Sequence, residues 1–328
     1  MHRRVFIGLL AVGAARPGGV AAQPAAGVHR LGILAPTEAP RAADPRTATG
    51  SLPKHLEDLG YVPGRSLILE QRYAAGRLED LPAMARELVR LRVAVIVAIG
   101  SSATRAAKTA TSAVPIVMLG NFDPVAIGLV KSLAKPEANV TGVLIAPAGT
   151  LAGKKLELLK EAVPRATRIA FLTHEDPGLR GQEKETQAAA ATLGVTLALT
   201  RLRGDDYEAA FAAMVAGRPD ALFVAASTYF VRDRKRIIDL AARHRLPAMY
   251  EWPEQVEDGG FMSYGGDLGR TTRRVAEFVD RILKGARPGE LPIEQPTELQ
   301  LVINLKTARA IGLSVPPSLV ARADRVVE

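Results

Sequence analysis

Short runs of β-branched and aliphatic residues alternate with amphipathic helical patterns along this chain, and the alternation restarts in its second half. The clearest run, Val93–Ile99, is continuously apolar, which is typical of a strand buried on both faces of a parallel sheet. Similar runs occupy residues 31–35, 66–73, 115–119, 168–172, 195–202, 221–225, 247–250 and 261–264. This order predicts two α/β domains, each with a parallel sheet flanked by helices.

The length and the turn-rich stretches suggest how the two domains are divided. A chain of 328 residues is long for one domain and sufficient for two. Residues 139–149 and 285–296 are rich in turn formers, so we expect the chain to cross between the domains there. The predicted division is residues 28–144 plus about 266–295 in lobe 1, and about 145–265 plus about 296–328 in lobe 2.

The N-terminus has the order of a secretory signal peptide. Arg3 and Arg4 precede an apolar stretch, Val5–Ala15, that is too short to span a bilayer, and Val20–Ala22 offers small residues for cleavage. Residues 1–22 are therefore predicted to be removed, by either the general secretory or the twin-arginine route. Their loss takes away three arginines and no acid, which lowers the net charge from +9 to +6. We expect a soluble periplasmic protein without a lipid anchor, because the chain contains no cysteine.

Several kinds of chemistry are missing from the sequence. The absence of cysteine excludes disulfides, thiolate catalysis and cysteine-based metal sites. The five histidines are dispersed, and no dinucleotide fingerprint, Walker loop or nucleophile elbow follows a predicted strand. The basic residues are scattered among acids, which does not favour nucleic-acid binding. We therefore expect no catalytic residue, no metal, no cofactor and no nucleic-acid partner.

The loop Gly100–Ser102 is the most informative candidate for ligand binding. It follows the buried run that ends at Ile99 and precedes a predicted helix. Open α/β sheets bind ligands at the carboxyl ends of their strands, and a helix N-terminus presents free N–H groups to an anion. Ser101 and Ser102 could donate to a carboxylate or simply cap the helix, and the sequence leaves both interpretations open.

Other polar residues follow predicted strands and are weaker candidates. Asp123 precedes Pro124, so a capping role is favoured over ligand binding there. Tyrosines at such loops can stack on a ligand, although buried core tyrosines are commoner. The remaining candidates are Thr37, Tyr73, Asn121, His174, Ser227, Thr228, Tyr229, Tyr250 and Glu251.

A series of motifs resembles the ABC transporter substrate-binding proteins of the family that includes TrpX-like, tryptophan-binding receptors. The series covers nearly all of the chain after the signal. Its blocks are Arg3–Leu10, Leu59–Gly64, Leu88–Leu91, Asp123–Val125, Asn139–Gly142, Ala152–Lys160, Leu240–Ala248, Met262–Gly265, Gln295–Thr297, Leu301–Ala308 and Pro316–Leu319.

The resemblance implies a type I periplasmic-binding-protein fold, with two Rossmann-like lobes joined by a hinge of three crossings. It also implies a monomeric receptor that closes on a small molecule, an amino acid or other carboxylate, and delivers it to an ABC permease in the inner membrane. Three segments depart from the usual family pattern: the long stretch Thr37–Thr49, Thr173–Asp176 and Ala225–Tyr229. Because all three lie where a ligand would be touched, the ligand does not follow from the resemblance.

Two other functions fit the same residues. A sensory module would share the fold and the signal peptide and would differ only in its membrane partner. An enzyme on the same scaffold would need a reactive group beside a base in the cleft. A cytoplasmic repressor is disfavoured because no helix-turn-helix precedes the first predicted strand.

Overall fold

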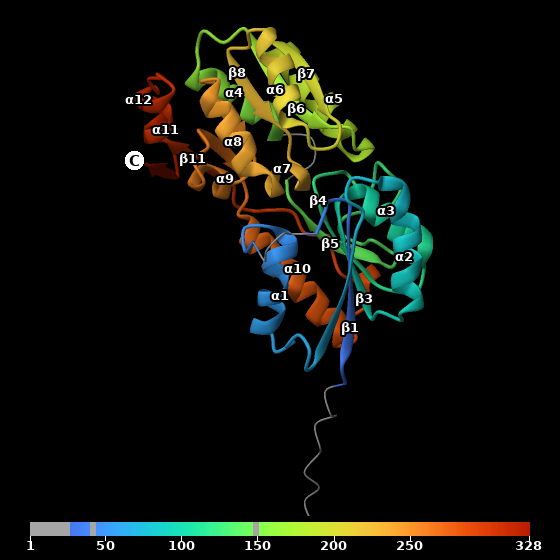
Figure 1. Ribbon diagram of the computed structural model, residues 1–328. Helices are drawn as coiled ribbons and strands as arrows, with labels where there is room; N and C mark the ends of the chain where they lie inside the picture. The colour runs from blue at the N-terminus through green and yellow to red at the C-terminus, as the bar shows by residue number, and fades with distance from the viewer. Residues whose placement is uncertain (1–26, 40–43, 147–150) are drawn as a thin grey trace, which may run out of the picture.

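The computed structural model describes residues 27–39, 44–146 and 151–328, which form two lobes stacked one above the other (Figure 1). Each lobe is built on one sheet with helices on both faces, as the strand–helix alternation predicted. The proposed signal peptide, residues 1–22, lies outside the described residues.

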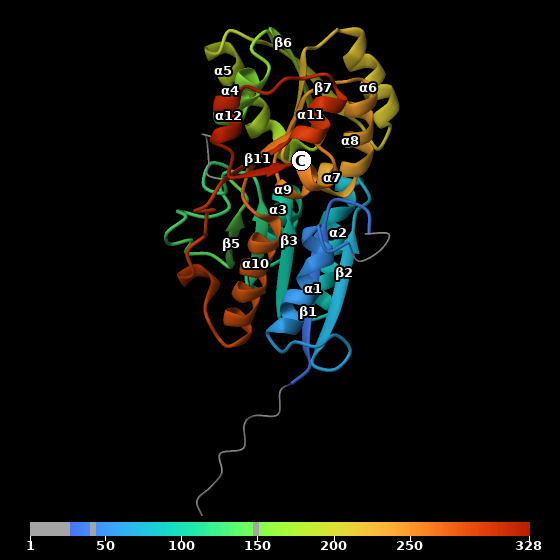
Figure 2. The same cartoon turned by 90° about the vertical axis from the view of Figure 1, so that its left-hand side faces the viewer.

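Lobe 1 contains a five-stranded, fully parallel sheet in the order β2-β1-β3-β4-β5. The strands are β1 (His29–Ala35), β2 (Leu67–Tyr73), β3 (Val95–Ile99), β4 (Ile116–Gly120) and β5 (Val140–Leu144). Every residue of β3 is buried, as its unbroken apolar sequence predicts. Helices α2 (Leu81–Arg90) and α3 (Gly100–Ala110) cover one face, and α1 (Ala48–Asp58) and α10 (Leu268–Leu283) cover the other (Figure 2).

Lobe 2 contains a seven-stranded sheet in the order β12-β11-β10-β9-β8-β6-β7. Its strands are β6 (Arg168–His174), β7 (Thr196–Leu202), β8 (Ala221–Val224), β9 (Ala248–Tyr250), β10 (Met262–Gly265), β11 (Gln300–Asn304) and β12 (Arg325–Val327). Its helices are α4 (Leu151–Ala162), α5 (Arg180–Thr192), α6 (Tyr207–Ala216), α7 (Thr228–Arg232), α8 (Arg234–Arg243), α9 (Pro253–Glu257), α11 (Leu305–Ala310) and α12 (Pro317–Ala321). Strand β11 pairs antiparallel with β10, which the expectation of parallel sheets did not include.

The chain passes between the lobes three times: between β5 and α4, between β10 and α10, and between α10 and β11. Three short 3-10 turns complete the elements: η1 (Leu78–Asp80), η2 (Pro177–Leu179) and η3 (Pro288–Glu290). The structure thus has the two-lobed α/β architecture expected from the sequence, while the exact lobe boundaries stay a prediction.

Two elements differ from the expectation. Strand β5 forms inside the stretch 139–149 that was interpreted as a connection, because its edge is completed by the segment before β11. There the N–H of Leu144 donates to the carbonyl of Glu294 at 2.8 Å, and the N–H of Glu294 donates to the carbonyl of Gly142 at 3.0 Å. Helix α1, which contains Pro53, was also missed; Thr47 starts it by accepting from the N–H of Gly50.

Candidate functional site

Two adjoining cavities lie between the lobes, at the carboxyl ends of the central strands, and together we call them the cleft. Each has a volume of about 40 Å³, and they share Ile145, Thr228 and Trp252. Sites for drug-sized ligands usually measure about 300–1,000 Å³. The lobes are in contact here, and neither cavity alone holds a ligand of that size. Two larger cavities between the lobes adjoin them, one of about 320 Å³ beside Ser101 and Gly178 and one of about 410 Å³ beside Glu38 and Arg232.

The two cavities differ in chemistry. The apolar cavity is lined by Thr37, Glu38, Thr47, Ala48, Thr49, Ile99, Leu119, Ile145, Thr228, Val231, Arg232, Trp252 and Leu268. The polar cavity is lined by Pro36, Gly100, Ser101, Gly120, Asn121, Phe122, Ile145, Asp176, Gly178, Leu179, Ala226, Ser227, Thr228, Tyr229 and Trp252. Both lobes contribute to each cavity.

The N-terminus of α3 forms one wall of the polar cavity. Gly100 opens the helix with φ +84°, a left-handed conformation that favours glycine, and no side chain caps the helix. Ser102 Oγ instead donates to Asp176 Oδ1 of lobe 2 at 2.7 Å. Gly178 follows in lobe 2, and a Cβ built there would lie 1.9 Å from Ser101 Oγ. The lobes thus meet closely at this helix end.

Asp176 brings a negative charge to the polar cavity. It is 7% exposed, and its Oδ1 also accepts from the N–H of Gly178 at 2.8 Å. Among the residues that line this cavity it is the single charged side chain. Asp176 therefore stands opposite the N-terminus of α3 and the hydroxyl of Ser101. This arrangement suits a ligand group that has a cation for Asp176 and an anion for the helix N-terminus.

His174 and Tyr229 support the lobe 2 wall. Their rings stack with centroids 3.8 Å apart and 5° between planes, and His174 Nδ1 accepts from the N–H of Asp176 at 3.2 Å. Burial lowers the pKa of His174 and raises that of Tyr229. The Tyr229 hydroxyl donates to the carbonyl of Pro36 in lobe 1 at 3.5 Å. This stack fixes the loop after β6 where it faces lobe 1.

The apolar cavity is walled by aliphatic side chains and by Trp252. Trp252 is 2% exposed and is the one tryptophan of the chain. The charged side chains that line this cavity lie together: Arg232 is paired with Asp233 and lies 3.7 Å from Glu38 of lobe 1. The cavity therefore suits an apolar or aromatic group with its end near Arg232.

The predicted site residues divide into two groups. The structure brings Thr37, Gly100, Ser101, Asn121, Ser227, Thr228 and Tyr229 together as lining residues of the cleft. The others lie outside these linings. Ser102 contacts Asp176, and His174 stacks on Tyr229. Asp123 accepts from the N–H groups of Val125 and Ala126 in a turn; the predicted helix cap there is wrong, because no helix lies in the described segment between β4 and β5.

Three predicted site residues are engaged elsewhere in their own lobes. Tyr73 donates to Gln71 Oε1 at 3.0 Å, and Tyr250 is 1% exposed within the lobe 2 core. Glu251 forms a buried ion pair with Lys155 of α4. A role in ligand binding for these residues, and for those that line the cleft, stays a prediction.

The sequence interpretation did not single out Asp176, Trp252 or Arg232. Asp176 lies two residues after β6, and Trp252 lies two residues after β9, so both occupy loops at the carboxyl ends of strands. The uniqueness of the tryptophan was the available signal for Trp252. No comparable signal marks Arg232, which reaches the cleft from the end of α7.

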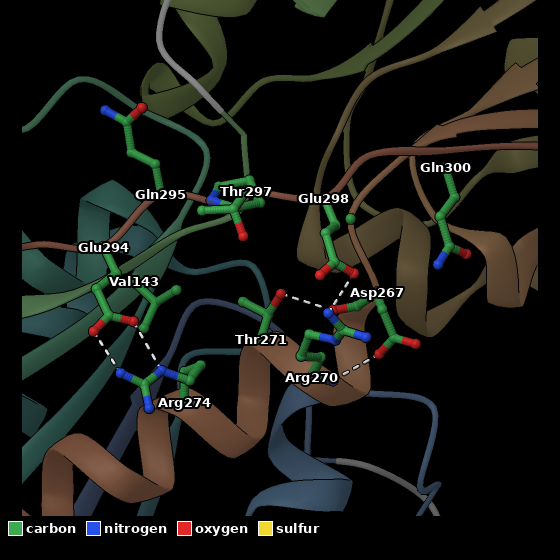
Figure 3. A pocket seen from close by; sticks show the side chains of 12 residues that line it. Val143, Asp267, Arg270, Thr271, Arg274, Glu294, Gln295, Thr297, Glu298 and Gln300 are labelled. Atoms are coloured by element: carbon green, nitrogen blue, oxygen red, sulfur yellow. Dashed lines mark hydrogen bonds and ion pairs between the residues drawn. The ribbon is translucent and has the colours of Figure 1, made fainter.

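A larger cavity of about 260 Å³ lies at the hinge, where α10 meets the segment that returns to lobe 2 (Figure 3). Arg274 Nε donates to Glu294 Oε2 at 2.8 Å, and Arg270 pairs with Glu298 at 2.5 Å. Both arginines are thus already neutralised by carboxylates of the crossing segment. This arrangement ties lobe 1 to its connection and leaves no free cation among the described lining residues for a ligand.

The described residues hold no cluster of metal-ligating side chains, and none of their helices is long and apolar enough to cross a membrane.

Comparisons with known proteins agree with the fold. The family model of ABC transporter substrate-binding proteins matches residues 38–327. A tyrosine-binding protein of Clostridioides difficile (strain R20291) is 26% identical over 269 residues, which is 79% of this chain and 75% of that protein. These matches cover both lobes and the cleft between them.

Solved structures show the same architecture. A conserved domain protein from Vibrio cholerae O1 biovar El Tor has a TM-score of 0.80 and 26% identity, covering 91% of this chain and 99% of its own. An ABC domain from Streptococcus pneumoniae in complex with L-Trp has a TM-score of 0.77, 23% identity and the same coverage. The fold is that of the type I periplasmic binding proteins. The chain belongs to the ABC transporter substrate-binding proteins, a family that implies a small-molecule ligand and an ABC transporter as partner.

Proposed function

We propose that this protein is an exported receptor that captures an amino acid with an apolar or aromatic side chain and delivers it to an ABC importer. The observation that carries the proposal is the junction of the two cavities at Trp252, where a polar compartment with both kinds of charge recognition opens into an apolar one. A zwitterionic head with an apolar tail matches both compartments at once. We assign no catalytic step to the cleft.

The head group would be held from both lobes. The N–H groups at the start of α3 and the hydroxyl of Ser101 suit the carboxylate, and Asp176 suits the ammonium. The side chain would lie against Trp252 in the apolar cavity. Two relatives support this class of ligand, since one is named a tyrosine-binding protein and another was solved with L-Trp.

The predicted signal peptide supports a location outside the cytoplasm. We propose cleavage after about Ala22, release as a soluble monomer into the periplasm, and docking on a permease of the inner membrane. The mass of the exported protein checks this: it should lack about the first 22 residues, whereas a mass that includes Met1 would contradict export by cleavage.

Calorimetric titration tests the ligand class. We expect binding of L-tryptophan, L-tyrosine, L-phenylalanine or L-leucine, and a large loss of affinity for tryptamine, which lacks the carboxylate, and for indole-3-propionate, which lacks the ammonium. Native mass spectrometry of protein purified without refolding provides an independent check. A co-purified ligand without a carboxylate, together with no binding of any amino acid, would refute the assignment.

A further inference from the structure

Two charged residues, Asp44 and Arg46, face the other lobe; they belong to the stretch Thr37–Thr49, which the sequence sets apart by its content of proline, alanine, arginine and aspartate. Asp44 and Arg46 lie in lobe 1, just before α1. Arg234, at the start of α8, and Asp258, just after α9, lie opposite them in lobe 2. We call these four residues the charge ring.

The ring is closed and its charges alternate in sign. Arg234 pairs with Asp44 at 2.9 Å and with Asp258 at 2.6 Å. Arg46 pairs with Asp258, and its own N–H donates to Asp44 Oδ1 at 2.9 Å. Two of these contacts, Asp44–Arg234 and Arg46–Asp258, cross the lobe boundary. Glu257 of lobe 2 adds a weaker partner, 3.9 Å from Arg46.

The lobe 1 half of the ring is held in place independently of lobe 2. The carbonyl of Asp44 accepts from the N–H of Thr47 at 3.1 Å and from its hydroxyl at 2.9 Å. Thr47 in turn caps α1. The backbone of Asp44 and Arg46 is therefore presented by the same turn that starts the helix, and the entropy lost when they meet lobe 2 is mainly that of their side chains.

The lobe 2 half is buried and remains paired when the lobes separate. The side chains of Arg234 and Asp258 are 4% and 10% exposed, and Arg234 also donates to the carbonyl of Val231 at 3.0 Å. Within the ring, opening would break the two contacts across the boundary and leave Arg234 bonded to Asp258. Asp44 and Arg46, by contrast, keep 36% and 41% exposure, so salt can reach and screen the attraction across the boundary.

We infer that the charge ring is a latch that favours the closed state before any ligand arrives. It makes the open–closed equilibrium, and through it the apparent ligand affinity, depend on ionic strength even for a ligand with no net charge. The inference deepens the proposed function, because it concerns the closure of the same cleft. Its test uses ligand-free protein, so a failure of the latch can be distinguished from a failure of the proposed ligand-binding function.

Because the native chain has no cysteine, two introduced cysteines can carry spin labels without background. Ala83 of α2 and Ala212 of α6 are exposed, one in each lobe, and suit Ala83→Cys and Ala212→Cys. The distance between the labels is measured by pulsed electron resonance in the ligand-free protein. The measurement is made at about 0.01 M and about 1 M salt, where the screening length falls from about 30 Å to about 3 Å.

Three variants are compared with the labelled parent. Asp44→Asn with Arg46→Gln removes the lobe 1 charges but keeps an oxygen at position 44 for the N–H of residue 46. Asp44→Arg with Arg46→Asp keeps the net charge but places like charges opposite each other. Lys54→Gln with Glu57→Gln, an exposed pair within α1, is the matched control.

We expect the parent and the control to be mostly closed at low salt and to open at high salt. The neutral variant should shift the closed-to-open ratio by on the order of tenfold at low salt and lose most of its salt response. In the swapped variant the closed-to-open ratio should change with salt in the opposite direction: the protein should be open at low salt and more closed at high salt. Parent, neutral and swapped proteins with the same distances and salt response would overturn the latch.

Discussion

Two adjacent serines at the start of α3 have different environments. Ser101 lines the polar cavity, whereas Ser102 donates across the lobe boundary to Asp176. Since neither side chain caps the helix, the capping interpretation does not describe this end of α3. The two hydroxyls should therefore affect ligand binding and lobe closure separately.

Replacing each serine alone tests this separation. Ser101→Ala should weaken ligand binding by roughly 1–3 kcal/mol, the cost of leaving a polar ligand atom without its partner, at an unchanged melting temperature. Ser102→Ala should raise the population of the open form, because Asp176 loses its contact with lobe 1. Calorimetry and thermal melting are run with exposed Ser318→Ala as the control. If Ser101→Ala lowers only the melting temperature, Ser101 has a structural role instead.

At this scale the sequence predicted seven of the residues that line the cleft. Gly100, Ser101 and Asn121 could be placed because they directly follow buried strands, whose carboxyl ends meet at one edge. Glu251 satisfies the same rule, but its partner Lys155 comes from a helix far away in the sequence. A rule based on position along the chain cannot foresee a partner that arrives from another element.

The ion pair between α4 and the end of β9 is the clearest test at the level of elements. Lys155 and Glu251 are 3% and 1% exposed, and Lys155 Nζ also lies 5.3 Å from the ring centroid of Phe223. Removing one partner leaves the other charged and buried, so Lys155→Met should lower the free energy of unfolding by about 3–5 kcal/mol. The double variant Lys155→Met with Glu251→Leu should recover much of that loss. Urea unfolding measures both, and a double variant no better than the single one would contradict this account.

The helices and strands were largely predictable where burial requires a regular pattern of apolar residues along the sequence. Strand β3 and helix α2 follow directly from an unbroken apolar run and from leucines at helical spacing. Helix α1 and strand β5 do not follow from the sequence pattern, because Pro53 and Gly142 interrupt it. Tertiary contacts stabilise both elements in spite of the interruption. The segment before β11 completes β5, and α10 packs against α1.

At the scale of the whole molecule, the two-lobed build permits motion about the connecting segments. Two lobes joined by three crossings can rotate, and a ligand that touches both favours the closed state through its differential affinity. Small-angle scattering at about 1 M salt, where the charge ring is screened, should show a smaller radius of gyration when the ligand saturates the protein. A non-binding analogue serves as the control. An unchanged radius at saturation would count against closure.

The pairing of Glu294 with β5 also affects how this protein behaves beside its own copies. An uncovered edge strand offers a row of free N–H and C=O groups to which another chain can add, which is a common route to aggregation. Here the β5 edge of the lobe 1 sheet is occupied by the chain's own segment, and the β12 edge of the lobe 2 sheet is three residues long, with Arg325 paired with Glu257 at 2.6 Å. At these two edges little strand is left for a neighbouring copy to extend, whereas the opposite edges of the two sheets, β2 and β7, have seven residues each.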